Sequence, residues 1–308
     1  MVDLNHDQLR TLIAVIDEGT FEAAAAKLHV TPPAVSQRMK ALEQAAGQVL
    51  VRRSTPVQTT EAGLVLLRHA RKIQLLDIDL ARELGESGRE AGTVSLPIAV
   101  NADSLATWFL DALIALGPRG DLVFDIRRDD QEHTLELLRS GEVAAAITSV
   151  AEPVQGATSV PLGSMRYRAV CSPEFVTAHL GGVAHVRRIA NAPFLDFDRK
   201  DMLQHRLYRD ALGHEGQAPR HYVPTSADFA RAVIGGLGWG LLPDQQCAAE
   251  LERGELVRLA GAKDVRVPLY WQRWALPSTV LDEVTDAVRA AARSSLLGQP
   301  RDWATLTA

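Results

Sequence analysis

The chain has 308 residues, of which 46% are hydrophobic and 23% are charged, and its formal net charge is −5 at pH 7. This length suits two domains, and the apolar content gives each domain a core, which excludes a mainly disordered chain. Cys171 and Cys247 have neither CxxC nor metal-site spacing, so we expect two reduced, buried thiols. No signal peptide pattern opens the chain, and no apolar run reaches the roughly 18 residues of a membrane span, so we expect a cytoplasmic protein.

Three zones follow one another along the chain. Residues 1–59 alternate short helical patterns with tight breaks, residues 60–88 predict one long helix, and strands alternate with amphipathic helices from Thr93 onward. The Gly- and Ser-rich stretch 85–92 marks a hinge. We therefore predict an α+β chain with a winged helix-turn-helix domain at 1–59, a linker helix and hinge at 60–92, and an α/β domain at 93–308.

The first zone has the pattern of a helix-turn-helix. An amphipathic helix over 7–18 ends at Gly19, and a short Ala-rich helix over 21–28 is followed by a tight turn at His29. Thr31 is a good N-cap for a third helix, which runs to about Ala45.

The third helix has an outer face suited to nucleic acid. At about 100° per residue, the residues Val35, Met39 and Leu42 form its buried side. The opposite side presents Ser36, Gln37 and Lys40, whose side chains hydrogen-bond base edges or phosphates. Such a face on an isolated helix is usually only solvated, but the two short helices and the turn before it favour a DNA-reading helix.

Residues 49–59 predict a small hairpin, or wing, with Arg52 and Arg53 near its tip, where they would hold the phosphate backbone or the minor groove. The local positive charge matters more for DNA binding than the negative charge of the whole chain. The predicted DNA contacts are Thr31, Ala34, Ser36, Gln37, Arg38, Lys40, Arg52 and Arg53.

The long helix carries Leu66, Ile73 and Leu80 at a spacing of seven, with Leu76 between them. This spacing predicts a coiled-coil seam between two chains; the alternative is a stripe packed on its own domain. A dimer would place two reading heads on paired half-sites of an operator.

The motifs of the first two zones resemble the LysR-type transcriptional regulators. The residues that carry the resemblance are 21–43, 47–52 and 59–63, with one departure at Pro33, where the family usually has Ser. Residues 99–108, 139–143, 197–202 and 269–274 narrow the resemblance to the ArgP/LysG branch, which controls export of basic amino acids. The resemblance implies a homodimer or a tetramer, a two-lobed effector domain like a periplasmic binding protein, and activation of an exporter gene through RNA polymerase at the nucleoid.

Polar turns follow several predicted strands of the third zone, at 101–104, 145–149, 194–198 and 223–228. Ligands of α/β sheets bind beyond strand ends, so we expect these turns to meet in a cleft between lobe one, 93–161 with 265–308, and lobe two, 162–264. The first turn leads from a strand at 94–100 into a helix at about 105–116, and its backbone amides suit a carboxylate. The alternative is that the polar side chains only cap the helix.

A lysine or arginine ligand needs a carboxylate for its cationic end. We predict Asp198 first and Asp196 second for this role, and Asp103 for the α-ammonium group. The full set of predicted effector contacts is Asp103, Ser104, Thr148, Asp196, Asp198 and Ser226. We expect no metal and no cofactor, because the nine histidines show no metal spacing.

The glycine-rich stretch 235–243 is not a dinucleotide loop, because it follows a helix and enters a strand. We expect Trp271 and Trp274 to lie in the core. An enzyme would need an assembled nucleophile or acid–base pair, and the sequence shows no motif for one. A solute-binding protein would need a signal peptide. The main alternative is a regulator of the same family that answers another small ligand.

Overall fold

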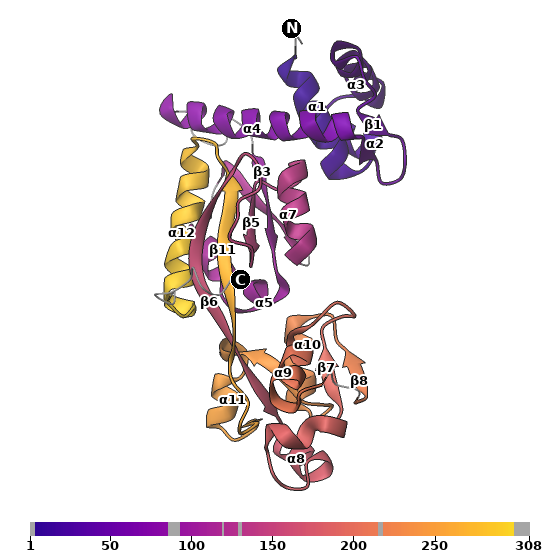
Figure 1. Cartoon of the computed structure of the whole chain (residues 1–308). Coiled ribbons are helices and arrows are strands. Elements are labelled where there is room, and N and C mark those ends of the chain that lie inside the picture. Colours follow the sequence, from indigo (N-terminus) through magenta and orange to yellow (C-terminus); the bar gives the residue numbers. More distant parts are fainter. Residues whose placement is uncertain (1–3, 86–92, 119, 129–130, 215–217, 299–308) are drawn as a thin grey trace.

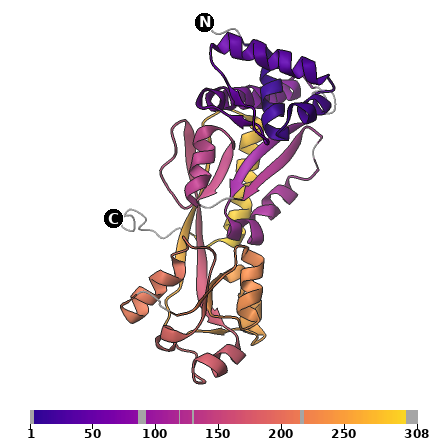
Figure 2. The ribbon, with the colours of Figure 1, turned by 90° about the vertical axis from the view of Figure 1, so that its right-hand side faces the viewer.

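The computed structural model describes residues 4–85, 93–118, 120–128, 131–214 and 218–298. Three parts follow one another in space: a helical N-terminal head, an upper lobe beneath a long helix, and a lower lobe (Figure 1). The view turned by 90° shows the same order, with two long strands passing from one lobe to the other (Figure 2). The chain is α+β overall, as predicted.

The N-terminal head is a helix-turn-helix with a two-stranded wing, as predicted. The side chains of Asn5 and Thr20 cap the first two helices, and Gly19 and Gly47 end the first and third in the left-handed conformation. The elements are α1 (His6–Glu18), α2 (Phe21–Lys27), α3 (Pro32–Ala46), β1 (Val51–Arg52) and β2 (Gln58–Thr59).

The linker helix α4 (Glu61–Glu83) lies across its own upper lobe. The prediction extended this helix to residue 88, but it ends at Glu83, and residues 86–92 of the expected hinge lie outside the described residues. At its start, a Cβ atom on Gly63 would lie 1.9 Å from the Leu50 carbonyl oxygen, so only glycine fits against the head. Further along, Leu75 and Ile78 are buried in the core of the upper lobe.

The upper lobe is a mixed sheet covered by helices. Its main elements are β3 (Val94–Val100), α5 (Ala102–Thr107), α6 (Phe109–Ala115), β4 (Leu122–Arg128), α7 (Gln131–Ser140), β5 (Ala145–Thr148) and α12 (Thr279–Ser295). β3 pairs in parallel with both β4 and β5. The single helix expected over 105–116 is wrong, because the chain breaks at Trp108. Consecutive residues of a straight helix point about 100° apart, and the break lets Trp108 and Phe109 both be buried.

Two long strands, β6 (Ala157–Cys171) and β11 (Val265–Trp274), run through both lobes as an antiparallel pair. Their register shifts between Leu269 and Tyr270, which pair with Gly163 and Pro161 and leave Leu162 as the extra residue of a bulge, and such a bulge bends a strand. The first expected lobe boundary, 161/162, therefore lies inside β6, and the second, 264/265, is the start of β11.

The lower lobe surrounds the far ends of these strands. Its elements are α8 (Pro173–His179), the 3-10 helices Val186–Asn191 and Asp244–Gln246, β7 (Phe194–Asp196), α9 (Leu203–Leu212), β8 (Arg220–Tyr222), α10 (Ser226–Ile234), β9 (Gly240–Pro243), α11 (Ala248–Glu252) and β10 (Val257–Arg258). The stretch 235–243 leaves α10 and enters β9, as predicted. Its packing is tight, because a Cβ atom on Gly238 would lie 2.6 Å from Leu195 Cδ1.

Two smaller predictions about the core are confirmed. Trp271 and Trp274 are buried, and Cys171 and Cys247 are free and buried. Among the described residues, no helix is long and apolar enough to cross a membrane.

Candidate nucleic-acid interface and effector cleft

The third helix of the head presents its predicted polar face. Val35, Met39 and Leu42 are buried beneath it, while Gln37 and Lys40 are exposed. The small side chains of α2 allow this close packing, since Ala24 and Ala25 are buried between the helices. The left-handed turn at His29, with φ 53°, brings α3 across α2. An amide and an ammonium group therefore stand free on the side away from the core.

The other predicted DNA contacts at the start of α3 differ in exposure and in hydrogen-bond partners. Ser36 and Ala34 are half-buried, and Thr31 occupies the N-cap position without a side-chain capping bond, which leaves its hydroxyl group for another acceptor. Arg38 is half-buried and donates from Nη2 to Asp7 Oδ2 at 3.1 Å. Arg38 therefore also ties α3 to the start of α1.

The wing adds two exposed arginines beside this face. Arg52 lies on β1, and the Arg53 guanidinium stacks over the Phe21 ring at 5.3 Å from its centroid. The wing is anchored to the head, because Val57 N donates to the Gly19 carbonyl oxygen at 2.8 Å. Both cations can therefore approach a phosphate backbone together with Gln37 and Lys40.

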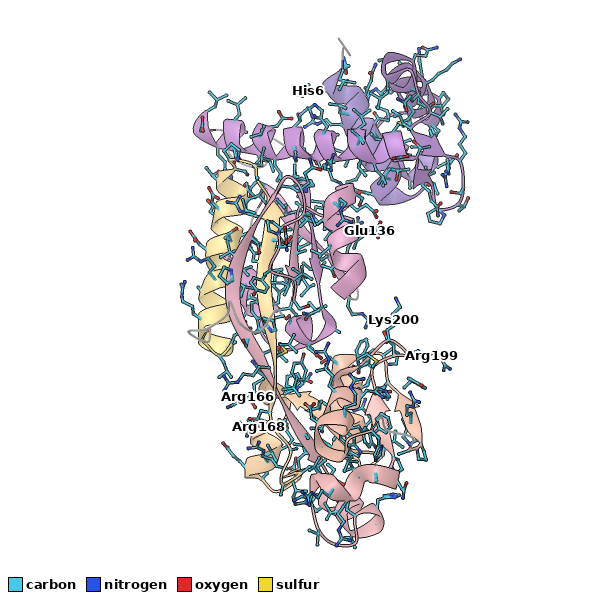
Figure 3. The ribbon with its side chains drawn as sticks, in the orientation of Figure 1. His6, Glu136, Arg166, Arg168, Arg199 and Lys200 are labelled. Atoms are coloured by element: carbon cyan, nitrogen blue, oxygen red, sulfur yellow. The ribbon has the colours of Figure 1, made fainter. Side chains whose placement is uncertain are left out.

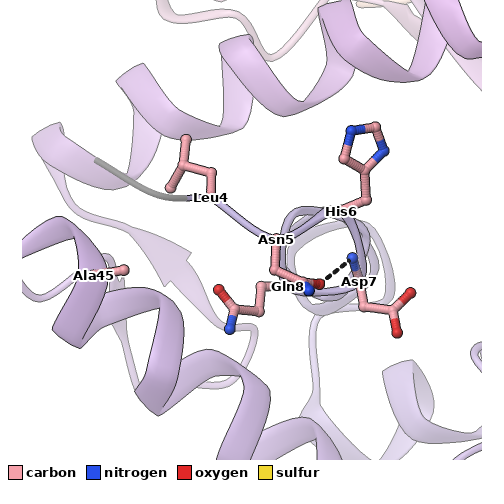
Figure 4. A pocket seen from close by; sticks show the side chains of 6 residues that line it. All are labelled: Leu4, Asn5, His6, Asp7, Gln8 and Ala45. Carbon is pink, nitrogen blue, oxygen red and sulfur yellow. Dashed lines mark hydrogen bonds between the residues drawn. The ribbon is translucent and has the colours of Figure 1, made fainter. Parts of the chain in front are cut away.

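A hollow of about 550 Å³ opens beside the start of α1 (Figure 4). Its lining residues are Leu4, Asn5, His6, Asp7, Gln8 and Ala45. Ala45 lies at the end of α3, whereas Ser36 and Gln37 lie near its beginning. The hollow is thus separate from the polar face of α3 and from the region between the lobes.

The predicted effector residues divide equally between the lobes. Asp103, Ser104 and Thr148 belong to the upper lobe, and Asp196, Asp198 and Ser226 belong to the lower lobe. The lobes meet in this region, because α5 lies against α10 and Arg128 Nη1 donates to the Pro224 carbonyl oxygen at 3.3 Å. The two sets of residues are therefore carried by elements that face each other.

In the upper lobe, the turn after β3 carries the hydroxyl group of Ser104, which is available to a ligand. Asn101, rather than Asp103 or Ser104, caps α5, since its Oδ1 accepts from Ser104 N at 2.8 Å. The Ser104 side chain is buried, and its Oγ has no hydrogen-bond partner in the part of the chain that the structure describes. Thr148, also buried, accepts from Val150 N at 3.2 Å. A buried hydroxyl group without a partner is costly, so Ser104 is a natural place for a ligand or water acceptor.

Tyr167 links the two sides. It lies on the crossing strand β6, and its hydroxyl group donates to Asp103 Oδ2 at 2.6 Å. Burial first, and then the Asp103 carboxylate, raises the pKa of Tyr167 well above its usual range, so the phenol stays protonated and keeps donating. The sequence interpretation missed Tyr167; its position in the buried alternation of β6, with Met165 and Ala169, was the available signal.

Asp201 is a second residue that the sequence interpretation missed. It follows Asp198 in the motif 197–202, and its carboxylate accepts from the backbone amides of Phe197 and Leu203, each at 2.9 Å. Burial raises the pKa of Asp201, and the nearby charge of Asp103 adds to this effect. Carboxylates from the two lobes therefore lie close enough to influence each other, which makes the region between them attractive to a cation.

Asp196 and Asp198 have local partners. Asp196 is 1% exposed, with Oδ2 3.3 Å from His205 Nε2 and 4.0 Å from Arg220 Nη1. Burial, followed by the Asp201 charge, raises the pKa of Asp196 to about 6. Asp198 is half-buried and closes a turn, since its Oδ1 accepts from Lys200 N at 2.7 Å. Lys200 and its neighbour Arg199 lie on the edge of the lower lobe nearest the upper lobe (Figure 3).

Ser226 opens α10 and is bonded within the lower lobe. Its Oγ accepts from Gln246 Nε2 at 2.9 Å. The structure thus brings Asp103, Tyr167 and Asp201 together, whereas Asp196 and Ser226 are held by their own lobe. Among the described residues, no group of three or more His, Cys, Asp or Glu side chains is placed to hold a metal ion.

Comparison with known proteins identifies the family. The helix-turn-helix of the bacterial regulatory proteins of the lysR family matches residues 6–64, and the LysR substrate binding domain matches residues 88–293. The lysine export transcriptional regulatory protein LysG of Corynebacterium glutamicum is 44% identical over 294 residues, covering 95% of this chain and 99% of that protein.

Two solved structures are similar over nearly the whole chain. The crystal structure of ArgP from Mycobacterium tuberculosis has a TM-score of 0.81 at 44% identity, covering 96% of this chain and all of that one. Full-length LysG from Corynebacterium glutamicum with bound effector Arg has a TM-score of 0.72 at 41% identity, with the same coverage. The chain therefore belongs to the LysR family of transcriptional regulators, on the branch that contains LysG and ArgP.

Proposed function

We propose that this regulator activates a gene for export of basic amino acids when lysine or arginine enters the cleft between its lobes. The observation that carries the proposal is the pair of carboxylates, Asp103 and Asp201, which approach each other from opposite lobes beside the Tyr167 hydroxyl group. The relative named for lysine export and the relative solved with arginine bound support the same ligand class.

The ligand chemistry fits the groups around the cleft. An amino acid with a cationic side chain carries two positive groups and one carboxylate. In this assignment Asp103 receives the α-ammonium group, and Ser104 Oγ donates to the α-carboxylate. Asp201 and Asp198 receive the side-chain cation, for which an arginine would supply a planar fork. In this assignment Asp196 pairs with His205 and stabilises the lower-lobe side of the cleft without touching the ligand.

We also propose that the chain acts as a homodimer or a dimer of dimers, joined through α4. Leu76, Leu80 and Leu84 are 41%, 54% and 69% exposed along one side of this helix. Leu76 and Leu80 border a hollow of about 400 Å³ between α4 and the start of α12. Leu66 and Ile73, the other members of the predicted seam, pack partly against the head of their own chain. The seam is therefore proposed for the second half of α4 alone.

Ligand binding acts on DNA through lobe closure in this scheme. The ligand must bind the closed and open assemblies unequally to shift one to the other. Closure changes the angle between the paired heads, and so the bend of the operator and its contact with RNA polymerase. We place this action in the cytoplasm at the nucleoid, where operator DNA and free amino acids are both present. The effector is the only small molecule that the proposal requires, with no cofactor.

Thermal unfolding of the full chain with a panel of amino acids tests the ligand class. Lysine, arginine or both should raise the melting temperature, because a ligand that binds only the folded state stabilises it. Stabilisation by a different amino acid alone would favour a family member with another effector. No stabilisation by lysine, arginine or histidine would contradict the proposal.

Calorimetry on variants tests the site itself. Asp201→Asn and Asp198→Ala should each weaken lysine or arginine binding by about tenfold or more, because each removes a charge-assisted hydrogen bond. Asp286→Asn, on the exposed side of α12, is the matched control and should bind as the wild type does. Unchanged affinity in the Asp198 variant would remove that residue from the site.

A further inference from the structure

A buried arginine joins the DNA-binding head to the upper lobe. Arg71 lies on α4 with its side chain 5% exposed, and its Nη2 donates to Asp17 Oδ1 at 2.5 Å. Its Nη1 donates to the carbonyl oxygens of Gly141 at 3.0 Å and Glu142 at 2.5 Å. One guanidinium group therefore contacts α1 of the head and the turn that leaves α7 in the upper lobe.

Asp17, the partner of Arg71 in the head, lies at an unfavourable position for a carboxylate in its helix. Asp17 lies in the last turn of α1, where the helix dipole disfavours a carboxylate. Its side chain is 29% exposed and faces a guanidinium that is almost fully withdrawn from water. A buried guanidinium needs a charged or strongly accepting partner, and here Asp17 is the carboxylate that supplies it.

The partner in the upper lobe is held just as closely. Gly141 has φ 84°, and a Cβ atom there would lie 2.3 Å from Arg68 Cβ, so α4 touches the turn's backbone directly. Arg68 Nη1 donates to the Arg139 carbonyl oxygen at 2.8 Å. Two guanidinium groups of α4 thus bind three carbonyl oxygens at the end of α7, which is the negative end of that helix.

The turn held by Arg71 leads directly to the cleft. From Gly141 the chain enters β5, a buried strand of the central sheet that ends at Thr148. Of this path only β5, Ala145–Thr148, is paired strand, bound to β3 and β11, and at about 3.3 Å per residue it is roughly 10 Å long. The turn that Arg71 binds therefore connects through three residues to a strand whose far end, Thr148, is one of the predicted effector contacts.

We propose that Arg71 is a positioning residue: its bond to Asp17 fixes the angle of the DNA-reading head relative to the upper lobe. Loss of this bond loosens the angle of the head on α4, which still packs into the head through Leu67 and Ala70, while α4 keeps its other contacts with the upper lobe. These include Arg82, which pairs with Asp121 and Glu283 of the upper lobe and touches no residue of the head among the contacts described. The proposal uses the family's DNA binding and does not depend on which effector is bound.

Distances between spin labels on the full-length protein test the positioning. Labels on Glu22→Cys of α2 and Glu136→Cys of α7 measure the distance between the head and the upper lobe. Both positions are exposed and the native cysteines are buried, so only the introduced thiols are labelled. Dilution with unlabelled protein removes distances between chains. The parent should give one narrow distribution, Asp17→Asn a broad one, and Asp17→Glu, which keeps the carboxylate, a narrow one again. Arg82→Gln, the matched control, should stay narrow.

Binding to selected operator DNA gives the functional readout. Asp17→Asn should lower affinity for a duplex with two half-sites by about tenfold, because two heads at fixed angles bind as one unit. Its affinity for a single half-site should equal that of the wild type, which a misfolded head would not show. A narrow distance distribution in Asp17→Asn, equal broadening in Arg82→Gln, or equal loss on both duplexes would each overturn the proposal.

Discussion

Replacing Gly141 by alanine probes how closely the linker helix is docked on the upper lobe. Gly141 has φ 84°, and left-handed backbone costs an L-residue about 1–2 kcal/mol. The new Cβ atom would also lie 2.3 Å from Arg68 Cβ and 2.9 Å from Arg68 Cα, atoms that cannot swing away without moving α4. Overpacking of this kind costs about 1–3 kcal/mol more.

Gly156→Ala is the matched control, because Gly156 has φ 80° and no atom of the described residues lies within 4 Å of its added Cβ atom. Both variants carry the backbone strain, and only Gly141→Ala carries the clash. At roughly 2–4 °C per kcal/mol for a domain of this size, the melting temperature of Gly141→Ala should fall about 2–12 °C below that of Gly156→Ala. Equal melting temperatures, measured by circular dichroism on the full chain, would refute the close docking of α4.

Three further predictions concern DNA contact, pH and the thiols. Lys40→Ala should weaken binding to all duplexes alike and reduce the salt slope by about one, whereas Gln37→Ala should relax sequence preference; gel-shift titrations at several salt concentrations measure both. The pKa of Asp196 rises from 3.8 to about 6 on folding, so the folded chain binds this proton more tightly and Asp196 lowers stability as pH increases through that window. Asp196→Asn should therefore gain stability relative to the wild type between those pH values in urea unfolding, and a constant difference would contradict this. Burial raises the pKa of Cys171 to about 12 and of Cys247 to about 11, so neither should react with a thiol reagent at neutral pH until the chain is unfolded.

The sequence predicts the head almost completely because its signals are local. Capping residues such as Thr20, terminal glycines and the spacing of Val35, Met39 and Leu42 all act within one or two helical turns. The break at Trp108 is harder to predict, because it depends on the core that must accept two neighbouring aromatic rings. The docking of α4 on the upper lobe is likewise set by Gly141 and Arg71, which lie 70 residues apart.

The candidate cleft was predicted in outline but not in its contacts. The polar strand ends at Asp103 and Asp196 could be found from the pattern of each segment alone. That Asp103 would meet Tyr167 depends on the path of β6 from one lobe to the other, which no local pattern encodes. Finding Asp201 beside Asp198 also requires the fold, since only the folded chain shows that the Asp201 carboxylate lies near Asp103.

Titration calorimetry of the full-length protein with arginine and lysine tests the central claim most directly. We predict binding of one or both, no binding of glutamate, and a loss of about tenfold or more in affinity for Asp103→Asn, which keeps the shape of the side chain but removes its charge. Absence of binding by both basic amino acids, or full affinity in the Asp103→Asn variant, would contradict the assignment of this cleft as their sensor.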